Sequence, residues 1–402
     1  MSAPNRPPAD RTSADRTSTA GRPRRVAALA AGLVTLVVAL AGCGVRLETP
    51  PPVEPSPDAV EQVRGRTVDD ALALAADARA LLDTGAAEPV AAVLADVVAF
   101  GEQHAQQLGG VYDSGLPDPT PSASPTATSV DPAPVEVGQV LADLATDAGR
   151  ALDDADAVTD GPLARLVGSV GTARGELATR LAAALGVPAP EVVTSAGTAA
   201  DGAAADGAAA AGGGGETTGA DDAAADGTDG ASGDPAGTAT GAPTDAPPSS
   251  TAPAGLERTD LDALTVAHDE AGFALEVVAA KLTADQRALA QATAAEHRQE
   301  ADRWARASGA AGTLADPRRA AYALPAGLDD PAVATGLVRT VETGVADTTA
   351  NAVAAAEPGA RAALLTALRD ATVRARAWGA APVAFPGMPE LAAGPLPTAA
   401  EG

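Results

Sequence analysis

Apolar residues recur at alternating spacings of three and four along eight stretches of this 402-residue chain. That spacing places the apolar side chains on one face of an α-helix, whereas strands need an alternation of two. Four of the stretches lie within residues 58–187 and four within residues 256–391. The pattern therefore predicts an all-α fold with two arrays of four helices, of which the C-terminal one is a four-helix bundle.

The apolar faces of the C-terminal array define its expected core. The first helix has the face Leu261, Leu264, His268, Ala271, Leu275, Val278 and Leu282. The third has Leu337, Val341, Val345, Thr348 and Ala352, and the fourth has Leu364, Leu368, Ala371, Ala375 and Trp378. The second face, Leu289, Thr293, His297, Glu300 and Trp304, is the most polar. Polar groups on such faces must find partners inside the bundle.

In both arrays the connection between the second and third helices is long. These connections are residues 109–135 and 309–329. A helix of about 24 residues is about 36 Å long, and about 11 extended residues can span that distance. Both segments can therefore return the chain along the bundle, which is the ferritin-like order of helices. The alternative is a loop between adjacent antiparallel helices. The shared order also indicates that the arrays are duplicates of one unit.

The two arrays are separated by residues 188–255. Within residues 191–253 there are ten acidic residues, no basic residue and no aromatic residue. Such a segment buries too little apolar surface to offset the conformational entropy that ordering would cost. We therefore predict a disordered, acidic, Ala/Gly-rich linker at residues 188–255 and a flexible tail at residues 392–402.

The only cysteine of the chain, Cys43, closely follows an uncharged apolar run, Val26–Leu40. This run is shorter than the roughly 20 residues that a membrane-spanning helix needs, but it suits the apolar region of a signal peptide. An exported protein with one thiol cannot form an internal disulfide, so the cysteine needs another use. The alternative interpretation is a plain transmembrane anchor.

The end of the apolar run, Leu40-Ala41-Gly42-Cys43, resembles the bacterial lipobox. The resemblance implies thioether lipidation of Cys43, cleavage after Gly42, and acylation of the new amino terminus by a chain such as palmitate. Two or more acyl chains anchor a protein stably to a membrane. We therefore expect a signal peptide at residues 1–42, a Pro-rich tether at residues 43–57, and a lipid-anchored protein on the extracytoplasmic face of the cell membrane.

The chain is strongly acidic, with a net charge of −26. The expected signal peptide holds six arginines and two aspartates, so the mature chain has a net charge of −30. Such a surface repels nucleic acid and anionic headgroups, which argues against nucleic acid as a partner. We interpret the charge as a solvated acidic exterior.

Four stretches of the C-terminal array carry a family resemblance. They read "ALTVAHDEAGFALEVVAAKL", "AAYALP", "LVRTVETGVADTTANAVAA" and "ALRDATVRARAWGAAPVAFPGMPEL". They are similar to actinobacterial lipoproteins with a ferritin-like domain of unknown function. The resemblance covers residues 256–391, about a third of the chain. It implies a ferritin-like four-helix bundle and a location in the cell envelope, and it implies no reaction.

A ferritin-like di-iron site needs a glutamate from each of two helices and Glu-x-x-His from each of the other two. The C-terminal array offers His268 on its first helix and His297 with Glu300 on its second, while Glu342 lies beside the third apolar face. The fourth face offers no ligand, so a two-metal site is incomplete. A single metal held by His268, His297 and Glu300 remains the alternative to a structural hydrogen bond between the histidines, or between His297 and Glu300.

Other chemistry finds little support in the sequence. The chain has no Gly-x-Ser-x-Gly nucleophile motif and no phosphate-binding loop. The remaining histidine, His104, is expected at the edge of the N-terminal bundle. We therefore predict no catalytic residue, no cofactor, and a non-enzymatic binding or scaffolding role with an unknown envelope partner. The alternative function is a metal-binding or redox ferritin-like protein.

Overall fold

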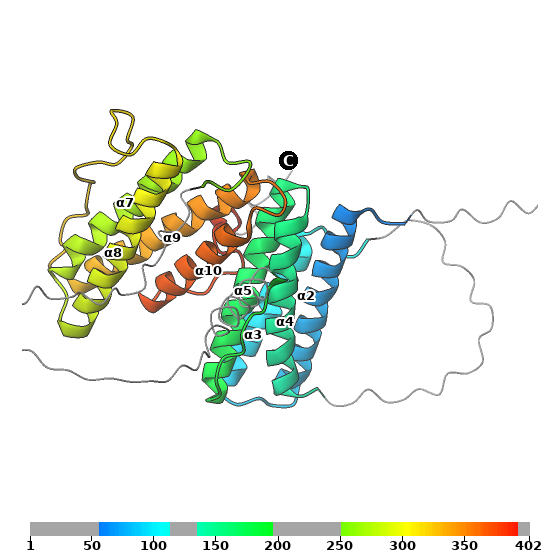
Figure 1. The fold of residues 1–402 in the computed structure, drawn as a ribbon. Coiled ribbons are helices and arrows are strands. Elements are labelled where there is room, and N and C mark those ends of the chain that lie inside the picture. The colour runs from blue at the N-terminus through cyan, green and yellow to red at the C-terminus, as the bar shows by residue number, and fades with distance from the viewer. Residues whose placement is uncertain (1–55, 113–134, 196–250, 393–402) are drawn as a thin grey trace, which may run out of the picture. The chain divides into compact units, whose positions relative to one another are not determined.

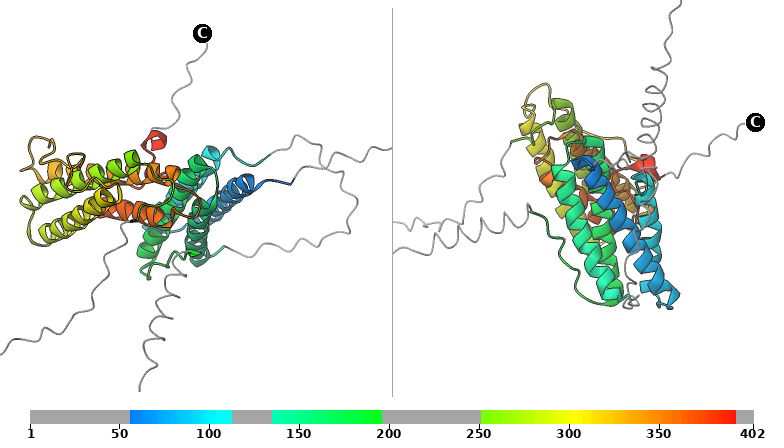
Figure 2. Two further views of the ribbon diagram at one scale, coloured as in Figure 1. Left: turned by 45° about the horizontal axis from the view of Figure 1, so that its top comes forward. Right: turned by 90° about the vertical axis from the view of Figure 1, so that its right-hand side faces the viewer.

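A computed structural model of the chain describes residues 56–112, 135–195 and 251–392. These residues form helices and connecting segments, without a strand in the described ranges (Figures 1 and 2). The expected signal peptide, the lipobox with Cys43, and most of the expected linker and tail lie outside them. The predictions for those segments therefore stay predictions.

The helices fall into an N-terminal and a C-terminal group, which confirms the predicted fold class. The N-terminal array comprises α2 (Ala59–Asp83), α3 (Val90–Gln107), α4 (Val137–Ala157) and α5 (Gly161–Leu185). The C-terminal array comprises α7 (Arg258–Ala279), α8 (Ala284–Ala307), α9 (Pro331–Ala355) and α10 (Ala362–Ala377), and the short α11 (Pro389–Ala392) follows it.

Ion pairs fix the direction of the N-terminal helices. Between α2 and α4, Arg66 Nη2 pairs with Asp154 Oδ1 at 2.5 Å, and Asp70 Oδ1 pairs with Arg150 Nη1 at 2.9 Å. As α2 advances, its partner on α4 moves backwards, so the two helices are antiparallel. The short α2–α3 connection makes these helices antiparallel too, so α3 and α4 run in the same direction. This is the predicted ferritin-like order.

The long connection of the C-terminal array, residues 308–330, runs the length of α7. Three contacts record its course, in chain order: Ala315 O with Arg258 Nη2 (3.4 Å), Arg319 N with Asp269 Oδ2 (3.1 Å), and Asp329 Oδ1 with Lys281 Nζ (2.6 Å). The chain thus passes from the beginning of α7 to its end before α9 starts. The predicted crossover is confirmed here, and the alternative of a loop between adjacent antiparallel helices is wrong.

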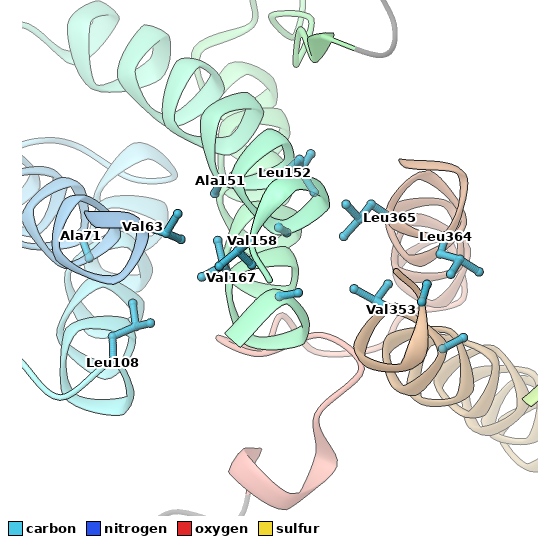
Figure 3. Packing of buried hydrophobic residues seen from close by; sticks show 14 of the residues in the cluster. Val63, Ala71, Leu108, Ala151, Leu152, Val158, Val167, Val353, Leu364 and Leu365 are labelled. Carbon is cyan, nitrogen blue, oxygen red and sulfur yellow. The ribbon is translucent and has the colours of Figure 1, made fainter. Parts of the chain in front are cut away.

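The two arrays share one hydrophobic cluster, a point that the sequence left open. Leu365 of α10 lies opposite Leu152 and Val158 of the N-terminal array (Figure 3). A Cβ atom on Gly168 of α5 would meet Leu365 Cδ2 at 2.5 Å, so a larger residue there would force the Leu365 side chain to move. The buried Arg361 adds polar contacts, since its Nη1 donates to Val158 O at 2.6 Å.

Residues 384–390, which we call the C-terminal clasp, leave the C-terminal array and pack on the N-terminal one. Phe385 and Met388 are buried in the cluster that α2–α5 form. His104 Nε2 donates to Ala384 O at 2.8 Å, and Ser169 Oγ donates to Pro386 O at 2.8 Å. The expectation of an edge position for His104 is wrong, because the clasp covers it and leaves it 1% exposed.

Candidate functional site

A chain of four polar side chains crosses the interior of the C-terminal array. His268 Nδ1 of α7 lies 2.9 Å from His297 Nδ1 of α8. His297 Nε2 lies 3.0 Å from Glu342 Oε1 of α9, and Arg374 Nε of α10 donates to Glu342 Oε2 at 3.0 Å. Each helix of the bundle contributes one member, and the first three side chains are buried.

The hydrogen-bond pattern assigns the protons of this chain. A carboxylate only accepts, so His297 Nε2 is the donor to Glu342. His297 Nδ1 then carries the lone pair in the neutral ring and accepts from His268 Nδ1–H. Burial lowers the pKa of His268 well below its ordinary value, and the charges of His297, when protonated, and of Arg374 add to this. With neutral rings on His268 and His297 and one buried ion pair, Glu342–Arg374, these four side chains are joined by a continuous set of hydrogen bonds.

The structure brings two of the three candidate metal ligands together and separates the third. The predicted His268–His297 hydrogen bond is present. Glu300, however, pairs with Arg303 of its own helix, whose Nε donates to it at 2.9 Å, and its side chain is 38% exposed. The expected bond between His297 and Glu300 is therefore replaced by the bond to Glu342.

The roles of Glu342 and Arg374 were missed in the sequence. The buried face of α9 contains Ala334, Val338, Glu342, Val345 and Thr349, one position on from most of the predicted face. This buried face also follows spacings of three and four. Because it has a glutamate in its middle, the neighbouring set of residues is more apolar and was therefore the predicted face. Arg374 lies in the last turn of α10, where cations interact well with the helix dipole, and its Nε nevertheless reaches inwards to Glu342.

The donor set does not fit a metal centre. Glu342 is the one carboxylate in hydrogen-bond contact with the histidines, and the Arg374 guanidinium binds one of its two oxygens. A cation in that place repels a metal ion and removes one of the lone pairs that a metal would use. Across the described ranges, no three His, Cys, Asp or Glu side chains are grouped so that they could hold a metal ion.

Asp269, next to His268, holds the long connection against α7. Its Oδ2 accepts from Tyr322 OH at 2.7 Å and from Arg319 N at 3.1 Å, and its Oδ1 pairs with Arg298 of α8. Burial and the bond to this carboxylate raise the pKa of Tyr322. These contacts of Asp269 hold the long connection over the face of α7 and α8 that lies beside the histidines.

The comparison with known families follows the same division of the chain. Residues 261–390 match a domain of unknown function, DUF4439. It is a ferritin-like domain. Its span includes the whole polar chain and ends in the clasp. The N-terminal array lies outside the matched residues. No curated protein and no solved structure matches the chain.

The expected lipobox residues, Leu40, Ala41, Gly42 and Cys43, lie outside the described ranges. Within those ranges, none of the helices is long and apolar enough to cross a membrane.

Proposed function

We propose that this chain is a lipoprotein anchored through Cys43 on the extracytoplasmic face of the cell membrane, with a non-enzymatic binding or scaffolding role. Support for the anchor comes from the signal-like segment and the Leu-Ala-Gly-Cys sequence that ends it. Support for the role comes mainly from the Glu342–Arg374 ion pair. In this pair the buried carboxylate of the DUF4439 domain is bound by an arginine of the same domain, so it is not available to a metal or a substrate.

A groove between α5 and α10 is the surface that best supports binding. Its volume is about 610 Å³, and its charged lining residues are Glu176, Arg180, Glu191, Arg369 and Arg376. Arg376 pairs with Glu176, and Arg180 pairs with Asp96. Arg369 has no hydrogen bond or ion pair to any residue that the structure describes. It also lines an adjoining groove of about 600 Å³.

The partner that fits this groove is an acidic segment of another envelope protein. An unpaired, half-buried guanidinium gains most from a carboxylate, which it can bind through two parallel hydrogen bonds. The walls between the charges are small or apolar, and Val373 and Ala377 are exposed in them.

The anchor is tested by replacing Cys43 with serine. Without the thiol no thioether can form, so we expect the precursor to stay unprocessed or the protein to leave the membrane fraction. The measurement is the mass of the mature amino terminus together with fractionation of the envelope. A C43S protein that is cleaved at the same bond and stays membrane-bound would contradict the lipobox.

The binding role is tested by crosslinking from the groove in intact cells. A photoreactive residue at Val373, which is 61% exposed, should form a crosslink with another protein. Arg369→Glu should reduce that crosslink strongly, because it reverses the charge that attracts the acidic segment. A photoreactive residue at the exposed Leu314, far along the chain, is the control. A crosslink formed only within the chain itself, or one that survives R369E, would contradict the proposed partner.

A further inference from the structure

The centre of the N-terminal array contains a small cavity of about 10 Å³, lined mostly by apolar side chains. All four helices line it, and its polar lining residues are His104 of α3 and Arg174 of α5. Arg174 is 1% exposed, and its Nη2 donates to Thr67 O at 2.9 Å. Its Nε and Nη1 are buried and have no hydrogen-bond partner in the described part of the chain. The nearest ion-pair contact is with Asp70 Oδ2, 3.7 Å from Nη1.

His104 offers the complementary group. Its Nε2 donates to Ala384 O in the clasp, so in the neutral ring Nδ1 is an acceptor. Burial, followed by the charge of Arg174, lowers the pKa of His104 to about 3, which keeps the ring neutral. The cavity is thus lined by Arg174, which has two N–H groups without a hydrogen bond in the described part of the chain, and by His104, which has an acceptor nitrogen.

The polar residues of the two arrays occupy matching positions when each is counted from the start of its helix. His104 on α3 corresponds to His297 on α8 to within a single position. Arg174 on α5 corresponds equally closely to Arg374 on α10. The third helices carry the buried acids Asp147 and Glu342, which also match to within a single position. The N-terminal array therefore holds a buried histidine, acid and arginine at helix positions similar to those of the polar chain, but without a direct bond between its histidine and its acid.

We propose that this cavity binds a single water molecule, which accepts from Arg174 and donates to His104 Nδ1. One water needs about 10–15 Å³ of such space and two to four polar partners, and both conditions are met here. A buried donor without a partner costs free energy, which the water offsets. By donating to Nδ1 the water also fixes the His104 tautomer whose Nε2–H holds the clasp.

Charge favours water over a halide ion at the same place. Of the charged residues, Arg174 lines the cavity and lies 3.7 Å from Asp70, which also pairs with Arg150, and Arg150 in turn pairs with Asp147. Two cations and two acids thus form one connected group. When both acids are ionised, the net charge of these four residues is zero, and a bound water molecule does not change it. An anion would add an uncompensated charge to the core and is larger than the space.

The test fills the cavity with one extra carbon. Val97, which lines it and is 2% exposed, is changed to isoleucine in the full-length protein. Displacing a bound water strands the Arg174 donors, so V97I should lower the melting temperature by about 3–6 °C. In an Arg174→Met background no donor is stranded, and the same change should leave the melting temperature unchanged or raise it. Val170→Ile, which enlarges a packed core residue away from the cavity, should act equally in both backgrounds.

Two results would overturn the proposal. A V97I change that is neutral or stabilising in the wild-type background would mean that the cavity is dry. A bromide ion bound beside Arg174 in crystals soaked in bromide, seen by its anomalous signal, would mean that the site takes an anion. A water peak between Arg174 and His104 in a high-resolution crystal structure would support it.

Discussion

Replacing Arg374 with methionine is expected to destabilise the protein by about 3 kcal/mol. Glu342 is completely buried, and the guanidinium of Arg374 is its only cationic partner in the described structure. Removing one member of a buried ion pair typically costs about 3–5 kcal/mol, because the other charge is left uncompensated. We expect the lower end, since Glu342 keeps its bond to His297. The measurement is the free energy of unfolding from denaturant titration.

Two further variants separate this effect from lost packing. Changing Glu342 to leucine in the R374M background removes the stranded carboxylate, so part of the stability should return. Arg369→Met removes an arginine of the same helix that has no partner among the described residues, and it should change stability by less than about 0.5 kcal/mol. If R374M and R369M had equal effects, the ion pair would not be what stabilises the bundle centre.

Replacing Phe385 with alanine is expected to cost about 3–4 kcal/mol and to affect both arrays. The ring is 5% exposed and packs edge-on against His104 at a centroid distance of 5.2 Å. Truncating a buried phenylalanine typically costs about 3–5 kcal/mol. Phe385 belongs to the C-terminal part of the sequence but is buried in the core of α2–α5. Its loss should therefore destabilise the N-terminal array, although the substitution lies in the DUF4439 domain.

The chain contains a convenient probe for this coupling. Its two tryptophans, Trp304 and Trp378, are both buried in the C-terminal array. Their fluorescence follows that array, whereas circular dichroism follows all helices. In F385A the two signals should shift to lower denaturant together if the arrays share one core. Leu314→Ala, at a fully exposed position, is the matched control. A loss of less than about 1 kcal/mol in F385A, against the usual cost of such a truncation, would contradict the role of the clasp.

The helices were predictable from the sequence because their apolar faces are periodic. Every residue predicted on the first face of the DUF4439 domain is buried, as is every residue on its fourth face. The prediction failed where a buried position is polar. Glu342 interrupts the true face of α9, and Leu289, predicted in the core, is 47% exposed. Periodicity measures hydrophobicity, so it cannot find a carboxylate whose partners lie on other helices.

The contact between the arrays could not be predicted for a different reason. It depends on glycines and on a segment outside the helical pattern. On α5, a Cβ atom at Gly161 would lie 2.2 Å from Ala354 O of α9, and one at Gly168 would lie 2.5 Å from Leu365 Cδ2 of α10. The clasp depends on Gly387, whose φ of +75° other residues rarely adopt. The "FPGMPE" sequence is part of a stretch that carries the family resemblance, but nothing in a spacing pattern indicates which surface such a segment covers.

The His268–His297–Glu342–Arg374 chain is expected to act as a charge-compensated structural centre that takes no metal. The decisive measurement is the melting temperature of the protein, purified without chelator, with and without Fe(II), Mn(II) or Zn(II), alongside its metal content. A ligand at 100 times its Kd stabilises the state that it binds by about 2.7 kcal/mol, which would raise the melting temperature of a protein of this size by about 5–10 °C. We predict no such rise and no stoichiometric metal. A metal-dependent rise that disappears in a variant with both His268 and His297 changed to leucine would show instead that the two histidines bind a metal.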